Sequence, residues 1–442
     1  MTAPVRERRM SSVTASFLVV ATMIGTGIFT TTGYLVRDIG SYAGVLLAWL
    51  IGGLTAMCGA LAYAELIAAI PSNGGEYRLL TRVFNRPVGF MAAWASLVVG
   101  FAAPMAASSV AFESYAYAAL GFEPLPKNVL AIALITALAV LHAVSVAGAE
   151  RFQNWFTVGK ILLVGSLVVA GGVAGDFGRI AHETSKPLGE ALASPGFAVG
   201  LIFVSYAYSG WNTAAYIAGE VKTPERNLPR ALLFGTGLVV LLYVGITAVF
   251  LSATDGATLV AAEERVGHAA CAALFGEWAA RGLSALIAVG LVSAVGALIA
   301  TGPLIYASAG EDYPRLRVFT VRRAGGGPIY SIALQYGLAV IMILSAQYDA
   351  ILIYSGFTLS ILAALTVLGV FVLRRNEPNL ARPYRTWGHP WTTLLFLLLS
   401  MWMVVYAIVD EPWSALVGVS TLAVGLVLYR WARPAEGISA GP

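Results

Sequence analysis

The sequence predicts an all-α polytopic membrane protein with twelve transmembrane helices, and its composition gives the first reason. Of the 442 residues, 58% are hydrophobic and 11% are charged, whereas roughly a quarter of an ordinary soluble protein is charged. A surface this poor in charge cannot face water, which excludes a disordered chain, a disulfide scaffold and a nucleic-acid-binding module. The 47 glycines fit the same class, because helices that pack closely in lipid need small residues. The two cysteines, Cys58 in an apolar run and Cys271 in a polar loop, indicate no disulfide framework.

Apolar stretches of about 20 residues give the second reason, because that length crosses a bilayer as a helix. The twelve stretches are 11–36, 42–70, 87–112, 128–147, 152–174, 196–219, 230–251, 283–308, 330–347, 350–373, 391–409 and 413–431. We group 11–174 and 196–373 as two sets of five helices, 391–431 as two additional helices, and 1–10 and 432–442 as the termini. The first span is too long, and lacks the cleavage site, for a signal peptide.

The basic residues predict the orientation in the membrane. Twenty lysines and arginines fall in the termini and in the loops on the same side, and six fall on the other side. The positive-inside rule therefore predicts a protein of the cell inner membrane with both termini in the cytoplasm. The same distribution accounts for the net charge of +4 without an acidic partner.

Two spans are interrupted by residues that suit a helix interior poorly. The first contains Gly25-Thr26-Gly27, and the sixth contains Ser209-Gly210-Trp211-Asn212. A glycine costs about 1 kcal/mol in a helix interior, and a polar Asn in the bilayer must find partners. Close packing of small residues explains either run alone. The matching placement of the two runs favours a functional explanation.

The second interruption comes five spans after the first. Because five is odd, a repeat of five spans is inverted in the membrane relative to its copy, and paired breaks in such repeats mark the substrate site of a transporter. A break exposes N–H groups that attract a carboxylate, and C=O groups that attract an ammonium. The pair of breaks therefore suits a zwitterion.

Three motifs resemble one family over nearly the whole chain. The run IGTGIF (24–29) resembles the GSGIF-type motif of the amino acid, polyamine and organocation (APC) superfamily. The runs YAELIAAIPSNGGEY (63–77) and SYAYSGWNTAAYIAGEVKTPERNLPRAL (205–232) are similar to the L-amino acid transporter branch of that superfamily. The last motif is long and very specific.

The resemblance implies the LeuT-type fold, with five plus five inverted spans and two extra helices, and it implies a substrate site. The amine would be held by carbonyls of Met23 or Ile24 and by Tyr206, Ala207 and Ser209, and the carboxylate by N–H groups of Thr26, Gly27 and Ile28. Tyr206 would cap the substrate from outside. The chain departs from the family at Thr26, usually Ser, and at 307–314, which lacks the usual arginine.

Asn212 bears on the charge of the substrate. Arginine/agmatine exchangers of the superfamily resemble this chain here but have a carboxylate at the matching position. A neutral amide leaves a second substrate charge uncompensated at low dielectric, which is costly. Asn212 therefore predicts neutral amino acids, and Ser209 and Tyr206 favour small ones by narrowing the pocket.

Lys160 lies within the fifth span, away from the loops that hold the other lysines and arginines. Its ammonium either snorkels to the cytoplasm or, as the resemblance implies, lies between the first and eighth spans where sodium-coupled relatives bind sodium. Ser293 is a candidate partner in the eighth span.

Four further charged residues lie near span ends. Glu65 is predicted either to pair with a loop arginine or to act in gating, and Glu220 and Lys222 are either gate charges or ordinary helix-end charges. Glu113 is predicted to be interfacial.

The sequence indicates no cofactor. Of the histidines only His142 lies within a span, so paired haem ligands are missing, as are metal clusters, nucleotide loops and nucleophile elbows. We therefore predict a sodium-independent permease for neutral L-amino acids that works by alternating access in the lipid bilayer. Two modes stay open, symport with protons and obligatory exchange of amino acids. No obligatory protein partner is evident. A membrane enzyme or electron-transfer subunit is the alternative from another class.

Overall fold

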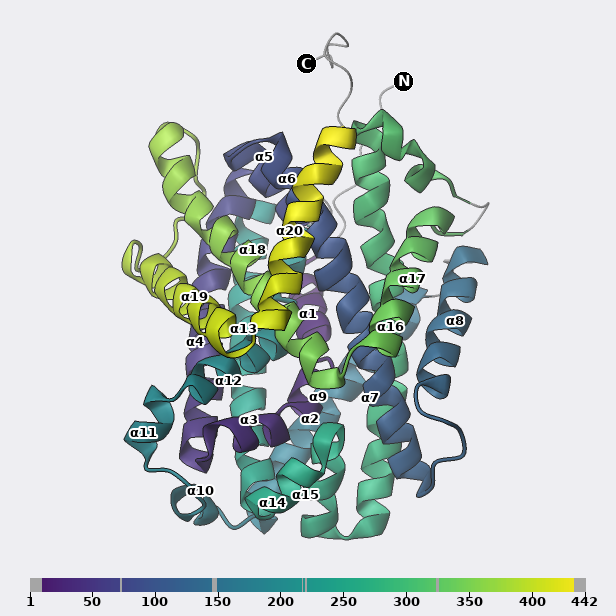
Figure 1. Cartoon of the computed structure of the whole chain (residues 1–442). Coiled ribbons are helices and arrows are strands. Elements are labelled where there is room, and N and C mark those ends of the chain that lie inside the picture. Colours follow the sequence, from purple (N-terminus) through teal and green to yellow (C-terminus); the bar gives the residue numbers. More distant parts are fainter. Residues whose placement is uncertain are drawn as a thin grey trace.

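The structure is a computed structural model that describes residues 10–71, 74–144, 149–216, 218, 221–322 and 326–432. Within these residues the chain forms helices joined by loops (Figure 1). We call the face on which the last helix ends the terminal face (top of Figure 1), and the opposite face, with α3, α10, α14 and α15, the far face.

The first half contains one broken helix and several long ones. Its elements are α1 (Ser12–Met23), α2 (Gly27–Thr30), α3 (Thr32–Ile39), α4 (Tyr42–Ala69), α5 (Gly75–Val83), α6 (Arg86–Ala95), the π-helical η1 (Ser96–Ala102), α7 (Ala103–Leu120), α8 (Val129–Val144) and α9 (Ala149–Ala174). Polar caps set several starts: the Ser41 hydroxyl accepts from the Gly44 N–H at 3.3 Å, and the Asn85 side chain accepts from the Val88 N–H at 3.0 Å.

The second half repeats the pattern of a break followed by long helices. After the short α10 (Arg179–His182) and α11 (Leu188–Ala193) come α12 (Pro195–Tyr208), the 3₁₀-helix η2 (Trp211–Ala215), α13 (Pro224–Ala253), α14 (Gly256–Ala261), η4 (Glu263–Arg265), α15 (Val266–Phe275), α16 (Glu277–Asp312), η5 (Pro314–Thr320), α17 (Ile329–Ser345), α18 (Tyr348–Asn376), α19 (Trp391–Asp410) and α20 (Pro412–Ala432).

The helices are long and apolar enough for a polytopic membrane protein. Over the described residues, eight helical segments have the length and hydropathy to cross a membrane. Four shorter apolar helices, Val129–Val144, Val158–Ala174, Pro195–Tyr208 and Ile329–Ser345, fall at four other predicted spans. Twelve crossings and the inverted repeat stay predictions.

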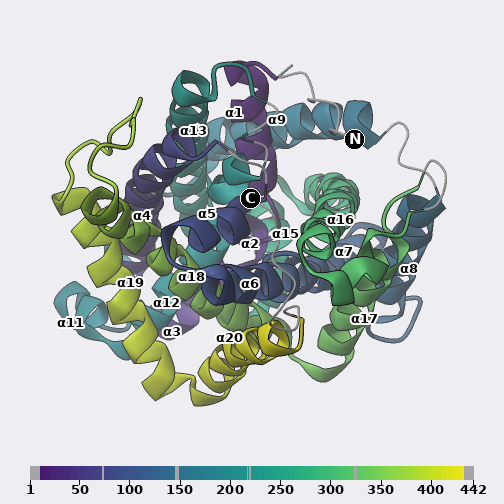
Figure 2. The same ribbon diagram turned by 90° about the horizontal axis from the view of Figure 1, so that it is seen from above.

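The broken helices lie inside the bundle. α1 packs against α13 and η2, α4 packs along α13, and α7 packs along α16. Seen from the terminal face, α19 and α20 lie at the outer edge, whereas α5 lies inside the ring of outer helices (Figure 2).

One sequence prediction about a single residue is wrong. Cys271 does not lie in a polar loop but in α15, where it is 5% exposed, because residues 256–275 form short helices that pack between longer ones. Glu113, which the sequence predicts to be interfacial, is 6% exposed, and its carboxylate accepts the N–H groups of Asn128 at 2.7 Å and Ala131 at 2.9 Å at the start of α8.

Candidate functional site

The first break follows directly from the glycines around Thr26. α1 ends at Met23, where the Ile24 N–H makes the last helical bond to Val20 O at 2.9 Å, and α2 begins at Gly27. The first N–H groups of α2 therefore have no partner within their own helix, and the last carbonyls of α1 point out of theirs.

The second break requires Gly210. Its φ of +106° suits glycine, and a Cβ there would lie 2.7 Å from the Thr22 carbonyl oxygen. α12 ends at Tyr208, Ser209 is extended, and η2 starts at Trp211. The chain thus changes helix type at the residues that the sequence singled out.

The two breaks lie against each other. The Thr22 hydroxyl donates to Gly210 O at 3.0 Å, and the hydroxyls of Thr26 and Tyr206 are 3.5 Å apart. A Cβ on Gly27 would be 2.6 Å from Ala207 Cα, so α2 and α12 are in backbone contact. The predicted substrate residues that are buried are Met23, Ile24, Thr26, Gly27, Ile28, Tyr206 and Ala207, whereas Ser209 and Asn212 are half-buried.

Carbonyls at the end of α1 already accept bonds from distant helices. The Tyr243 hydroxyl of α13 donates to Met23 O at 2.6 Å, and the Lys160 ammonium of α9 donates to Ile24 O at 3.1 Å. The stem of Lys160 also approaches Gly290 of α16, within 4 Å of where a Cβ would lie. Lys160 is 8% exposed, so it does not snorkel out of the bundle but lies between α1 and α16. Ser293 is buried in α16 and has an interaction within the protein.

Aromatic rings cover the breaks toward the far face. Tyr34 of α3 stacks on Phe203 of α12, with ring centroids 5.6 Å apart, and on Tyr348 of α18 at 6.4 Å. The Tyr348 hydroxyl donates to the Thr30 hydroxyl at 3.0 Å. Arg37 lies over the Tyr34 ring at 5.2 Å. This layer joins α3, α12 and α18.

On the terminal side of the breaks, Glu76 of α5 contacts Asn212. The carboxylate accepts the amide of Asn212, the hydroxyl of Tyr216 and, at 3.2 Å, the hydroxyl of Tyr63. Asn212 therefore does not lie among neutral groups only, as the argument on substrate charge assumed. A carboxylate lies directly against it, contributed by another helix.

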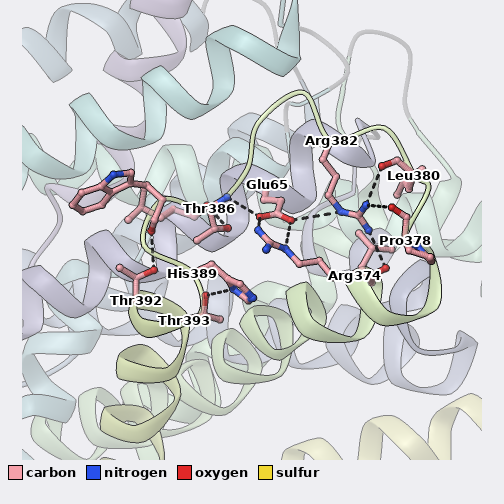
Figure 3. A network of polar contacts seen from close by, with 12 residues as sticks. Glu65, Arg374, Pro378, Leu380, Arg382, Thr386, His389, Thr392 and Thr393 are labelled. Atoms are coloured by element: carbon pink, nitrogen blue, oxygen red, sulfur yellow. Dashed lines mark hydrogen bonds and ion pairs between the residues drawn. The ribbon is translucent and has the colours of Figure 1, made fainter.

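Glu65 pairs with arginine at the terminal face. The carboxylate accepts two bonds from Arg374, at 2.8 and 2.7 Å, and one from the Thr386 N–H at 2.7 Å, and Arg382 Nε lies 3.6 Å away (Figure 3). Arg382 also donates to carbonyls of the same loop, including Leu380 O at 2.9 Å. The network ties α4 to the end of α18 and to the loop before α19.

Glu220 lies outside the described residues, and the backbone N–H of Lys222 donates to Met10 O at 2.9 Å. Sequence reasoning missed Tyr243, Tyr216 and Glu76. Glu76 is part of the motif 63–77 and follows the glycine pair Gly74-Gly75, which is the signal that could have drawn attention to it. No part of the described chain gathers three His, Cys, Asp or Glu side chains into a possible metal site.

Comparisons with known proteins identify similar sequences. The sequence profile described as "Amino acid permease" matches residues 10–429. The chain is 26% identical to Asc-type amino acid transporter 1 of Mus musculus, over 96% of this chain and 81% of that protein. It is 27% identical to large neutral amino acids transporter small subunit 2 of Homo sapiens (96% and 80%) and 28% identical to b(0,+)-type amino acid transporter 1 of Homo sapiens (96% and 87%).

Proposed function

This chain belongs to the amino acid permease family, a family of transporters rather than enzymes, and from that premise we propose that it moves neutral L-amino acids by alternating access, independently of sodium. The observation that carries the proposal is the contact between two helix breaks at the centre of the bundle, through Thr22, Gly210, Gly27 and Ala207. The breaks offer N–H groups at the start of α2 and carbonyls at the ends of α1 and α12, which suits the two charges of an amino acid.

Hydrogen-bond capacity favours one amine ligand over the other. A carbonyl oxygen has two lone pairs. Met23 O already accepts the Tyr243 hydroxyl at 2.6 Å and the Gly25 N–H at 2.8 Å, whereas Ile24 O accepts Lys160. We therefore assign the substrate amine to Ile24 O and the α12 carbonyls, and the carboxylate to the N–H groups of Gly27 and Ile28.

Independence from sodium rests on Lys160. Its ammonium lies between α1 and α16, with a hydrogen bond of 3.1 Å to Ile24 O, and so occupies the place that the resemblance gives to sodium in sodium-coupled relatives. Lys160→Ala should reduce uptake at least tenfold, because α1 and α16 lose the group between them. Initial uptake rates in proteoliposomes test this, with Ser166→Ala on an outer face of the same helix as the control. Wild-type rates in Lys160→Ala would contradict the assignment.

The proposed preference for neutral substrates depends on the hydrogen bonds that Glu76 already makes within the protein. Its two oxygens already accept three bonds from Tyr63, Asn212 and Tyr216, so the carboxylate is committed to the protein. A cationic substrate side chain would therefore have to compete with these three donors for Glu76, whereas Asn212, Ser209 and Tyr206 present only neutral groups.

Partner and location are proposed on two further observations. One relative is named a small subunit, whereas the sequence of this chain indicates no obligatory partner, and both of its cysteines are buried, at 8% and 5% exposure. We propose that the chain transports without a protein partner, in the inner membrane with cytoplasmic termini, as the distribution of basic residues favours.

The decisive experiment is uptake of labelled alanine into proteoliposomes. We expect saturable uptake that is unchanged when choline replaces sodium and that excess serine inhibits far more than excess arginine. Liposomes with and without internal alanine, under an imposed pH gradient, separate obligatory exchange from proton symport. Stimulation by sodium, or equal inhibition by arginine, would contradict the respective part of the proposal.

A further inference from the structure

Glu76 is a buried carboxylate that the proposed function does not place in contact with the substrate. It lies in the first turn of α5 and is 3% exposed. Its donors come from two other parts of the chain: Tyr63 from α4, and Asn212 and Tyr216 from η2 and the residue that follows it. The Tyr216 oxygen also lies 3.3 Å from the Ser96 hydroxyl of η1.

All three donors are neutral, and no partner of Glu76 among the described residues is a cation. The two arginines of α5 are used elsewhere, since Arg78 pairs with Asp312 at 2.9 Å and Arg82 pairs with Glu377 at 2.5 Å. Hydrogen bonds alone therefore compensate the buried charge. In such a cluster the hydrogen bonds to the carboxylate offset the cost of removing it from water. When the site opens, water molecules can take the place of the three protein donors.

The local backbone is shaped for this contact. Gly75 has a φ of +58°, and a Cβ there would lie 2.2 Å from the ring of Tyr216. Only glycine lets α5 approach this ring so closely. Because an ionised carboxylate only accepts hydrogen bonds, Glu76 also fixes which end of the Asn212 amide faces α5.

We propose that Glu76, with Tyr63, Asn212 and Tyr216, forms a latch that closes the path from the helix breaks to the terminal face. The inference rests on the proposed transport function. η2 directly follows the second break, and α5 lies over the middle of the bundle (Figure 2). The path opens when α5 leaves η2 and α4, and these bonds then break together. Glu76 is a positioning residue, since it acts by holding η2 rather than by touching substrate.

The test measures access to a site behind the latch and needs no substrate. In a background of Cys58→Ala and Cys271→Ala, Ser96→Cys places a thiol at a residue that is 4% exposed beside Tyr216. A membrane-impermeant maleimide is added at the terminal face. Adding Glu76→Gln, which keeps the size but turns one acceptor into a donor, should speed labelling at least fivefold. Tyr216→Phe should speed it in the same direction by less.

Glu113 supplies the matched control, because it is also a buried carboxylate with neutral donors, the N–H groups of Asn128 and Ala131, but lies toward the other end of α7. Glu113→Gln should leave the labelling rate unchanged. Equal labelling with and without Glu76→Gln would overturn the latch, even if alanine uptake is normal. If Glu76→Gln does not fold, unchanged labelling in Tyr216→Phe would overturn it. If the wild type takes up no alanine but Glu76→Gln still speeds labelling of the cysteine at position 96, the transport proposal is refuted and the latch is supported.

Discussion

Gly27 and Gly210 are both required at the breaks, but for different physical reasons. Gly210 has a left-handed backbone conformation that other residues adopt at a cost, whereas Gly27 has an ordinary helical position and lacks room for a side chain. The contact of Gly27 with Ala207 is backbone to backbone, so neither helix can yield by turning a flexible side chain.

We therefore expect Gly27→Ala to reduce alanine uptake at least tenfold while the protein still folds. The added methyl would lie 2.6 Å from Ala207 Cα and would push α2 from α12, which separates the two halves of the site. Initial uptake rates at equal protein density measure the effect. Gly237→Ala in α13 is the control, because a Cβ there meets nothing within 4 Å. Normal uptake in Gly27→Ala would remove this contact from the site.

Glu264, on the far face, makes the stability of the folded protein depend on pH. Burial raises the pKa of this carboxyl above its ordinary value of 4.5, although it accepts the Tyr34 hydroxyl at 3.4 Å. Between the ordinary and the raised pKa the folded protein binds more protons than the unfolded chain, so stability falls as pH rises through that window. Glu264→Gln should therefore melt higher than wild type at pH 8 and lose this advantage at pH 4. The exposed Glu190→Gln should show no such crossover in melting curves.

At the scale of whole elements, a buried ion pair between Glu65 and Arg374 links the end of α18 to α4. Glu65 is 1% exposed and Arg374 is 30% exposed, and their side chains make two bonds. Removing one partner of a buried pair costs about 3 kcal/mol, whereas an exposed pair contributes about 0–1 kcal/mol.

Two charge-removing variants on the terminal face can be compared directly. Glu65→Gln should lower the melting temperature in detergent clearly, because Arg374 and Arg382 lose their shared acceptor. Glu377→Gln, whose partner Arg82 is 53% exposed, should lower it by much less. Similar shifts for the two variants would contradict the view that Glu65 anchors this end of the bundle.

The sequence predicts some elements well because their signal is local. Helix interruption at Gly25-Thr26-Gly27 and at Gly210 follows from residue types that disfavour a helix, and both breaks lie where expected. The short helices α10, α11, α14 and α15 were not predicted, since they are below the length that hydropathy detects. The partners of the breaks were not predicted either: Tyr243 donates to Met23 from 220 residues away, and such a contact depends on the packing of whole helices.

At the scale of the whole molecule, the distribution of charge predicts one orientation in the membrane. In a background without Cys58 and Cys271, Asn379→Cys lies in an exposed loop on the terminal face, and Glu263→Cys lies exposed on the far face. We expect an impermeant thiol reagent to label residue 379 only in inside-out vesicles and residue 263 only in intact cells. Lysed cells, in which both thiols react, are the control. The reverse result would invert the orientation and exchange the roles of the two faces.

The length of α16 carries a consequence for the surrounding lipid. Its 36 residues give a rod of about 54 Å at 1.5 Å per residue, well beyond a hydrocarbon layer of about 30 Å. The helix must therefore lean, bend near Pro303 or extend past the acyl chains. Any change in the angle of α16 during transport then alters how much apolar surface the lipid has to cover. The acyl-chain length of the bilayer therefore contributes to the free energy of any step of the transport cycle in which the tilt of α16 changes.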